Sequence, residues 1–417
     1  MNRSPNISPN IRHDALHRTE PHDTLTADVV VADVVVVGAR CAGAATAMLL
    51  AERGHDVLVV DRATFPSDTL STHAIARTGV VQLDRWGLLD RIVESGAPAI
   101  RDVVFHSGDA SVHRAVKERF GRDFVIAPRR TVLDQILVDA AATAGARVRT
   151  GVTIEGVRRA DDGRVRGVYG RTGIDPIEVS ARVVVGADGL RSRIARSVGA
   201  ELTRVGPDSG TTQYTYVAGE WPAMEYFLGD GTFGGIFPTH GGEACIWVCT
   251  DTADADVARR RHGTPDAMFD ALLHDALPEL ADRLRGGIRT APVRGMRQLP
   301  NQFRRPVGDG WALVGDAGYH RDAVTGHGIS DAFRDAELLA DALDRALRGD
   351  TDEAVALAGY HAARDAMAAE IFDITCELSQ FPPAARFAEL QKALGRAIDA
   401  HAAELAARPR PAPCVAA

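Results

Sequence analysis

The hydrophobic pattern near the start of the chain predicts a short buried strand, a tight turn, a helix and a second strand. Four valines at 34–37 form a β-branched apolar run, which is typical of strands buried on both faces. Gly38 ends this run, and small residues followed by a helical pattern come next. A second apolar run covers 57–60 and ends at Asp61. Residues 33–62 therefore predict a βαβ unit.

The residues at the turn of this unit favour dinucleotide binding. Gly38 lets the chain leave the strand sharply, and Gly43 lets the helix lie close to the sheet. The N-terminal end of the helix stabilises a pyrophosphate, and Asp61 is placed to accept hydrogen bonds from a ribose diol. Arg40 stands where a glycine is usual, so it must swing out or lay its guanidinium over the phosphates. A buried βαβ unit that binds nothing is the alternative.

The rest of the chain alternates between strand and helix patterns. Period-two alternation over 147–185 predicts a β-meander, and 211–250 predicts a sheet in which the aromatic side chains of the chain are densest. These aromatic residues suit either a flat ligand or a plain sheet core. The apolar run at 311–314 predicts a strand, and Gly326–Gly328 then starts a long amphipathic helix whose N-terminus suits an anion. Residues 352–407 predict further amphipathic helices.

Two other helices have clear signals. Apolar residues over 133–141 share one helical face, so we expect Asp134 and Gln135 to face solvent. Thr264 is placed as an N-cap and Pro265 at the first helical position, which predicts a helix over 264–285.

Composition limits the class of protein. A hydrophobic content of 45% and a charged content of 25% are ordinary for a globular protein, and a net charge of −8 argues against nucleic-acid binding. No apolar run approaches the roughly 18 residues of a spanning helix. The polar first 28 residues predict a disordered leader over 1–28. The five cysteines are scattered, which predicts a reduced, cytoplasmic protein without a metal site.

Three motifs occur in a fixed order along the chain. They are the βαβ fingerprint at Gly38–Asp61, GADGLRSRIAR at Gly186–Arg196 and GDAGYHRDAVTGHGISDA at Gly315–Ala332. Together they resemble the FAD-dependent monooxygenases of the para-hydroxybenzoate hydroxylase type, whose relatives include flavin halogenases and geranylgeranyl reductases.

The resemblance implies an α/β fold with a Rossmann-like FAD-binding domain that carries a β-meander, a β-sheet substrate domain and C-terminal helices. We expect the FAD-binding domain to be discontinuous, over 29–100, 121–200 and 290–350. The substrate domain is expected over 101–120 and 201–289, and the C-terminal helices and tail over 351–417.

The resemblance also implies the cofactor and its contacts. FAD would be bound and NAD(P)H would act as a transient reductant. Gly38, Gly43 and Asp61 would hold the ADP half of FAD, Arg130 the flavin nucleotide and Asp316 the ribityl chain. Asp188 would act indirectly on ribose or pyrophosphate. The full set of implied cofactor-binding residues is Gly38, Arg40, Gly43, Asp61, Arg62, Arg130, Asp188, Gly315, Asp316, Gly326, His327 and Gly328.

Two residues near the flavin depart from the family pattern. Ala323 stands where proline is usual, and His327 stands where glutamine is common. His327 is a candidate catalytic residue because a histidine titrates near pH ~6.5, although it could equally cap the helix. His73 is a second candidate, and His320 is a weaker one. No second dinucleotide fingerprint is present.

The implied reaction is hydroxylation of an aromatic or other electron-rich small molecule through a flavin C4a-hydroperoxide, as in secondary metabolism. One alternative is reduction of an isoprenoid-like double bond, and another is FAD binding without catalysis. The halogenase motif W-x-W-x-I-P is absent, and Lys117 does not sit in a matching context, which disfavours halogenation. The pattern predicts no integral membrane association. It leaves open the catalytic base, the substrate, the choice of NADH or NADPH and the oligomeric state.

Overall fold

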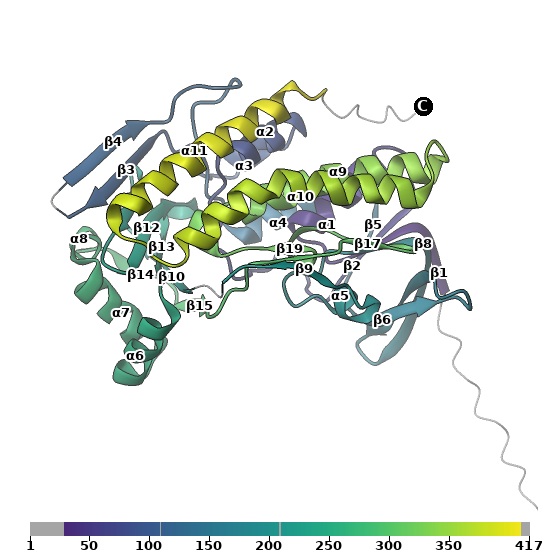
Figure 1. Cartoon of the computed structure of the whole chain (residues 1–417), viewed down its shortest axis with the longest axis horizontal. Coiled ribbons are helices and arrows are strands. Elements are labelled where there is room, and N and C mark those ends of the chain that lie inside the picture. Colours follow the sequence, from purple (N-terminus) through teal and green to yellow (C-terminus); the bar gives the residue numbers. More distant parts are fainter. Residues whose placement is uncertain (1–28, 109, 208–209, 410–417) are drawn as a thin grey trace, which may run out of the picture.

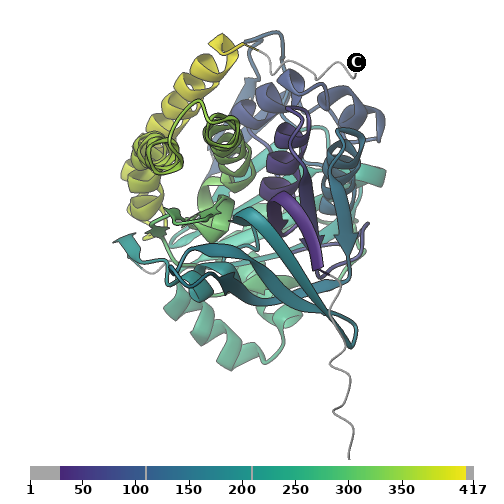
Figure 2. The same ribbon diagram turned by 90° about the vertical axis from the view of Figure 1, so that its right-hand side faces the viewer.

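The structure is a computed structural model that describes residues 29–108, 110–207 and 210–409. The leader expected over 1–28 lies outside these residues, as does the end of the C-terminal tail. Figure 1 shows one sheet on the right and a second on the left, with the long C-terminal helices running across both. Figure 2 shows the same layers after a quarter turn. The expected fold class, an α/β protein with several sheets and C-terminal helices, is confirmed.

The first sheet brings the strands of the three motifs to a common edge. Its order is β17–β18–β8–β1–β2–β5, and β6 and β7 extend it beyond β8. The strands are β1 (Val29–Val37), β2 (Val57–Asp61), β5 (Arg147–Thr150), β6 (Val152–Arg159), β7 (Val165–Thr172), β8 (Asp175–Gly186), β17 (Val307–Gly308) and β18 (Trp311–Leu313). β1 is parallel to β2 and β8, so Val37 lies opposite both Val60 and Gly186. In β18, Leu313 also lies opposite Gly186. The motif strands therefore end together.

The valine run of β1 is buried because both faces of the first sheet are covered. Val34 and Val36 pack under a layer of helices, and Val35 and Val37 pack against the β6–β7 extension. All four side chains are at most 7% exposed. The helices of this layer are α1 (Cys41–Ala51), α2 (Arg77–Arg85), α3 (Leu89–Glu94), α4 (Arg130–Thr143) and α9 (Gly328–Arg348). A β-branched run without alternation is what a two-sided parallel core requires.

The second sheet has the order β14–β10–β13–β12–β11–β3–β4, and β15 pairs with β10. Its strands are β3 (Asp102–Ser107), β4 (Ala110–Ala115), β10 (Thr211–Ala218), β11 (Met224–Leu228), β12 (Thr232–Pro238), β13 (Glu243–Thr250), β14 (Ile288–Arg289) and β15 (Arg294–Met296). Alternate side chains of its central strands point to opposite faces, and each face has its own buried cluster. The two faces therefore meet different helices.

One face of the second sheet is covered by α7 (Pro265–Ala276) and α8 (Pro278–Arg283), which follow α6 (Thr252–His262). A single helix was expected over 264–285. The helix is divided because Pro278 has no backbone N–H to continue the hydrogen-bond ladder. Thr264 does cap the first part, accepting a hydrogen bond from the Ala267 amide at 3.2 Å.

The other face of the second sheet is covered by α10 (Glu353–Leu378) and α11 (Ala384–Ala407). Figure 1 shows α11 passing over β12 and β13. These helices match the amphipathic pattern expected over 352–407. In the described part of the chain, no helix combines the length and apolarity that a membrane crossing needs.

The expected domain division stays a prediction, and the strand pairing adds two facts to it. β9 (Leu202–Val205), assigned to the substrate domain, pairs with β16 (Gln302–Arg304), and β16 also pairs with β19 (Tyr319–His320) in a separate small sheet. β15, assigned to the FAD-binding domain, pairs with β10 of the second sheet. β9, β15, β16 and β19 are two to four residues long, which is too short for periodicity to reveal.

A buried ion pair ties α2 to α9. The Arg85 guanidinium lies 2.8 Å from the Glu337 carboxylate, and both residues are less than 10% exposed. The Gln82 amide donates to the same carboxylate, and Arg85 also donates to the Pro409 carbonyl at 2.7 Å. This cluster fixes the chain just beyond the end of α11.

We expect Glu337→Gln to lower the free energy of unfolding by about 3–5 kcal/mol, because Arg85 would keep its buried charge without the opposing carboxylate. Urea denaturation measures the change. Asp341→Asn is the control, since Asp341 pairs with Arg53 at the surface and its loss should cost less than about 1 kcal/mol. Equal losses in the two variants would contradict the assignment.

Candidate active site

Two glycines form a cradle where the first and second motifs touch. Gly38 has φ +107°, and a Cβ atom there would lie 2.4 Å from the Ala187 carbonyl oxygen. A Cβ atom on Gly43 would lie 1.8 Å from the Gly38 carbonyl oxygen. The Ala187 amide donates to the Val37 carbonyl at 2.8 Å, which holds the two turns together. Only glycine fits at these two positions, so the backbone stays open toward the start of α1.

Asp61 is fixed at the same edge of the sheet. One carboxylate oxygen accepts the Ala39 amide at 2.7 Å and the other accepts the Ala63 amide at 2.8 Å. An ionised carboxylate has about four acceptor positions, so ribose hydroxyls can still be accommodated. Arg62 follows Asp61 and is exposed. The ribose contact and the role of Arg62 stay predictions.

Two arginines share a single buried carboxylate beside the cradle. Asp134 is fully buried, and the Arg40 guanidinium reaches it at 2.5 Å. Arg130 donates to the same carboxylate at 2.9 Å. The Arg40 side chain therefore points inward rather than into solvent or over the turn. Its guanidinium also donates hydrogen bonds to the backbone carbonyls of Ser67 and Asp68. Two guanidinium groups on one carboxylate leave an excess positive charge that suits a pyrophosphate.

Asp134 was expected to face solvent, and that expectation is wrong. Its carboxylate lies under α4, where it accepts from Arg130 one helical turn earlier and from Arg40 of the first motif. The apolar face of α4 alone predicted that Asp134 points to solvent. The sequence signal for its ion pair was Arg130, four residues earlier, because side chains at i and i+4 meet on a helix.

The Asp188 carboxylate holds the turn of the second motif by three hydrogen bonds. One carboxylate oxygen accepts the Ser192 hydroxyl at 2.5 Å, and the other accepts the Arg193 amide at 2.6 Å and the Ile194 amide at 3.2 Å. These contacts cap the short helix α5 (Arg193–Val198). Any effect of Asp188 on the cofactor is therefore expected to pass through the shape of this turn, and the role stays a prediction.

The third motif touches the first and presents a carboxylate to solvent. Gly315 has φ +60°, and a Cβ atom on it would lie 2.8 Å from the Ala42 Cβ, so η2 (Gly315–Ala317) abuts α1. Asp316 is exposed and lies within electrostatic range of Arg130. It is thus the carboxylate of this edge that is most open to a ligand hydroxyl.

The long helix α9 begins at the same motif. Gly326 has φ +60° and follows the 3₁₀ turn η3 (Ala323–Thr325), and Gly328 opens the helix. No described atom would lie within 4 Å of a Cβ atom on either glycine. The first amides of a helix have no partner within it, so an acceptor atom has room to approach them.

The candidate histidines are all partly or fully buried. The His73 ring nitrogen Nε2 lies 2.9 Å from the Tyr216 hydroxyl, and the Arg129 guanidinium lies 3.6 Å from the centre of the Tyr216 ring. His327 sits at the N-cap of α9 and is 2% exposed. His320 Nδ1 lies 2.6 Å from the Pro300 carbonyl oxygen.

Burial lowers the pKa of both His73 and His327 to about 3. The positive charge of Arg129 and Arg130 acts in the same direction on His73. Both rings are therefore neutral near pH 7. Their catalytic assignments stay predictions, and they are restricted to roles that a neutral imidazole can perform.

Tyr216 and Arg129 were missed as members of this cluster. They come from β10 and from the residue just before α4, so no local motif links them to His73. The Arg129 amide also donates to His240 Nδ1 at 3.2 Å, and its side chain pairs with Glu243 at 2.7 Å. The cluster therefore joins the second sheet to the start of α4.

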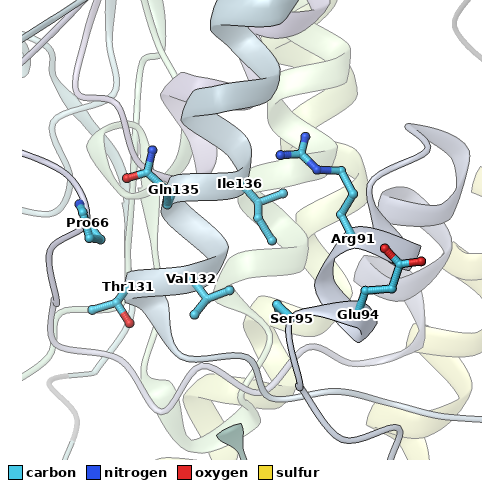
Figure 3. A pocket seen from close by; sticks show the side chains of 8 residues that line it. All are labelled: Pro66, Arg91, Glu94, Ser95, Thr131, Val132, Gln135 and Ile136. Atoms are coloured by element: carbon cyan, nitrogen blue, oxygen red, sulfur yellow. The ribbon is translucent and has the colours of Figure 1, made fainter.

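A depression of the surface lies between α3 and α4. It has a volume of about 630 Å³ and is shown in Figure 3, where Thr131, Val132 and Gln135 of α4 face Arg91 and Glu94 of α3 across it. None of the expected cofactor-binding residues lines it. We therefore expect the cofactor at the glycine cradle, where the open backbone at Gly38 and Gly43 lies beside the positive charge of Arg40 and Arg130.

Comparisons with known proteins show the family of this chain. Residues 31–375 match the family model described as FAD binding domain. The kynurenine 3-monooxygenase of Salinispora arenicola is 29% identical over 362 residues, which cover 78% of this chain and 75% of the relative. The digeranylgeranylglycerophospholipid reductase of Methanocella arvoryzae is 27% identical over 342 residues, with coverages of 78% and 80%.

A solved structure shows the same fold. It is that of PqsL, a probable FAD-dependent monooxygenase from Pseudomonas aeruginosa, with a TM-score of 0.71 and 22% identity. The match covers 87% of this chain and the whole of that chain.

We expect Gly43→Ala to weaken FAD binding about tenfold or more, because its Cβ would displace the Gly38 backbone from the cradle. The ratio of flavin to protein after purification and a titration of apoprotein with FAD measure the loss. Gly359→Ala in α10 is the matched control, since a Cβ atom meets no described atom there and alanine favours the helix. Full flavin content in the Gly43 variant would contradict the cradle.

The two buried histidines predict a pH dependence of stability. Their folded pKa of about 3 lies below the unfolded value near 6.5, so only the unfolded chain takes up protons between these values. Their stabilising contribution is complete above pH 6.5 and falls as the pH drops toward 3. Protonation of each histidine in the unfolded chain should lower the free energy of unfolding by about 2 kcal/mol between pH 7 and pH 5.

We expect His327→Gln to reduce the difference in unfolding free energy between pH 7 and pH 5 by about 2 kcal/mol, measured by urea denaturation at both pH values. His113→Gln is the control, because the His113 side chain is 63% exposed and remains in water when the chain is folded. An unchanged pH dependence in the His327 variant would show that this ring is not buried as a neutral group.

Proposed function

This chain belongs to the FAD binding domain family, and we propose that it is an FAD-dependent monooxygenase that hydroxylates an aromatic or other electron-rich small molecule with NAD(P)H as reductant. The observation that carries the proposal is the meeting of Gly38, Ala187 and Gly315 at one edge of the first sheet. Three motifs far apart in the sequence thereby share one cradle. The monooxygenases among the relatives support hydroxylation.

In this proposal each residue of the cradle would contact a different part of the cofactor. Gly38 and Gly43 let the pyrophosphate approach the start of α1, and the charge of Arg40 and Arg130 balances it. Asp61 would accept hydrogen bonds from the adenosine ribose hydroxyls, and Asp316 from the ribityl hydroxyls. The N-terminal amides of α9, which begins at Gly328, would stabilise negative charge on the flavin. Bound FAD supplies the electron transfer and the activation of O₂.

The protein's own contribution is to position substrate and exclude water. The face of the second sheet that carries Tyr214 and Tyr216 also holds Val324 of η3, so it lies against the flavin-facing turn. We assign the substrate to this face. The Tyr216 hydroxyl and the neutral His73 ring form the polar pair at its border, and they can orient a substrate hydroxyl by hydrogen bonds.

A second candidate function is reduction of an isoprenoid-like double bond. The digeranylgeranylglycerophospholipid reductase relatives favour it, and the same apolar face suits a polyprenyl chain. Incorporation of an oxygen atom from O₂ into the product separates the two reactions, because only hydroxylation transfers one. FAD binding without catalysis is the third candidate, and flavin reduction by a nicotinamide separates it from the other two.

We further propose that the protein works in the cytoplasm on a small molecule and does not bind nucleic acid. Its net charge of −8 would repel a phosphate backbone, and its described cysteines are free thiols, three of them buried.

The test begins with the purified protein, which should be yellow. We expect either NADH or NADPH to bleach the flavin under anaerobic conditions, and an aromatic substrate to increase NAD(P)H-dependent O₂ uptake. A protein that binds no FAD would end the proposal, and a flavin that neither nicotinamide reduces would favour non-catalytic binding. Anaerobic saturation of a polyprenyl substrate would favour the reductase.

A further inference from the structure

We infer that Ser111 is the nucleophile of a second catalytic centre, which takes an acyl group from a small activated ester and releases it to water. His106 is the base of this centre, and Glu225 orients the base. The three residues lie on the second sheet, whereas the glycine cradle lies at the first. The inference is therefore independent of the proposed function.

The three side chains form a continuous row of hydrogen bonds across three strands. The Ser111 hydroxyl of β4 lies 2.8 Å from His106 Nδ1 of β3, and His106 Nε2 lies 3.1 Å from a Glu225 carboxylate oxygen of β11. β3 is the strand between the other two, and His106 lies directly opposite Ser111. A hydroxyl, an imidazole and a carboxylate in this order and at these distances can activate a serine.

The carboxylate determines which ring nitrogen of His106 carries the proton. An ionised carboxylate only accepts hydrogen bonds, so the nitrogen that faces Glu225 must donate one. In the neutral ring the proton is therefore on Nε2, and the lone pair of Nδ1 faces the Ser111 hydroxyl. Nδ1 can thus take the Ser111 proton while the serine oxygen attacks a carbonyl carbon.

The base and its partner are held in this orientation by further contacts. The second carboxylate oxygen of Glu225 accepts a hydrogen bond from Arg283 Nε at 2.9 Å, and Glu225 is 5% exposed. The His106 ring stacks on the Phe227 ring, with 4.3 Å between the ring centres and an angle of 10° between the planes. The base therefore keeps its orientation before a substrate arrives.

Ser111 is open to solvent at the edge of the second sheet. β4 is the last strand of this sheet, and all six of its residues are exposed. Figure 1 shows β4 at the outer border of the molecule. The Val116 amide donates to the Arg101 carbonyl at 2.7 Å, and amides alternate in direction along an antiparallel strand, so the Ser111 amide points away from β3. This amide can donate to the carbonyl oxygen of an ester.

The reaction balances without the flavin. The Ser111 oxygen bonds to the acyl carbon, the bond from that carbon to the leaving oxygen breaks, and the Ser111 proton passes through His106 to the leaving oxygen. Water then attacks the acyl group and gives a proton to His106, and the released Ser111 oxygen takes that proton back. Because Ser111 stands on an exposed strand, we expect small esters with a good leaving group to react.

A second serine and histidine pair in the chain lacks the carboxylate. The Ser95 hydroxyl lies 3.0 Å from His240 Nε2, but His240 Nδ1 accepts the Arg129 amide at 3.2 Å. The proton of the neutral ring is therefore on Nε2, which donates to Ser95, and the Ser95 hydroxyl donates to the Ile92 carbonyl at 2.5 Å. No base faces this hydroxyl, so Ser95 is the matched control for Ser111.

Two reagents test the inference on the purified FAD-loaded protein. We expect p-nitrophenyl acetate to release p-nitrophenolate faster than in buffer, and Ser111→Ala to lower the protein-dependent rate about tenfold or more. Ser95→Ala should leave the rate unchanged. Phenylmethylsulfonyl fluoride forms a stable ester with an activated serine, so mass spectrometry of the digested protein should find it on Ser111 and not on Ser95.

Glu225→Gln separates a catalytic row from an ordinary hydrogen bond at the surface. Arg283 would still donate to the side-chain oxygen at 225, so the amide group of the glutamine would face His106 and donate to Nε2. The proton of the neutral ring would then move to Nδ1, which could no longer accept from Ser111. We expect the rate to fall about a hundredfold with unchanged flavin content, and His106→Gln to have the same effect.

No release above the buffer rate, release that survives Ser111→Ala, or equal labelling of Ser95 and Ser111 would overturn the inference. An unchanged rate in a Glu225→Gln variant that keeps its flavin would do the same. Reduction of the flavin by NADH or NADPH is measured separately, and Ser111→Ala should not alter it. Failure of the ester reaction therefore leaves the proposed function standing, and a colourless protein that still reacts with the ester would end only the proposed function.

Discussion

The parallel register of β1 with its neighbours is the constraint on which the site depends. Val37 lies opposite Val60 and Gly186, and the Ala187 amide bonds to the Val37 carbonyl. A slip of one residue would exchange the two buried faces of β1 and separate Gly38 from the Ala187 turn. Any other residue at that position would meet the Ala187 carbonyl, since a Cβ atom on Gly38 would lie 2.4 Å from its oxygen. The core of the first sheet thus sets the geometry of the cradle.

The hydrogen bonds and ion pair of Arg40 connect this cradle to a loop that reaches the second sheet. Arg40 bonds to Asp134 on one side and to the loop at Ser67 and Asp68 on the other. The same loop continues to Ser71, whose amide donates to the Tyr214 hydroxyl of β10 at 3.4 Å. One segment therefore touches both the expected pyrophosphate position and the expected substrate face. A glycine at position 40 could not make this connection, which gives a physical reason for the departure from the usual fingerprint.

Local patterns predicted the elements of the site well, because each motif lies next to a strand end. The valine run and Gly38 predicted the first unit, and Thr264 predicted the start of α7. What the sequence could not show is how distant residues pair. Asp134 is buried where it pairs with Arg40, 94 positions away, and Tyr216 of β10 meets His73 of a loop 143 positions before it. Such contacts depend on tertiary packing, which neither periodicity nor capping encodes.

The turn before α9 shows how tertiary contacts can supply the stiffness that a local residue lacks. Ala323 stands where the family resemblance expects a proline, so the backbone there is not restrained by a ring. Instead the Asp322 carboxylate accepts the Val324 amide at 2.7 Å, and the Asn301 side chain accepts the Asp322 amide at 2.8 Å.

The residue before this turn is held as firmly. Arg321 is 6% exposed and bonds to Asp331 at 2.7 Å and to the Thr375 hydroxyl at 3.1 Å. These bonds join the turn to α9 and α10 at once. Because each partner is buried, breaking one would leave an unpaired polar group, a cost of about 1–3 kcal/mol that a proline ring does not impose. The turn is thus held by its surroundings, and its geometry depends on the C-terminal helices that also cover the aromatic face.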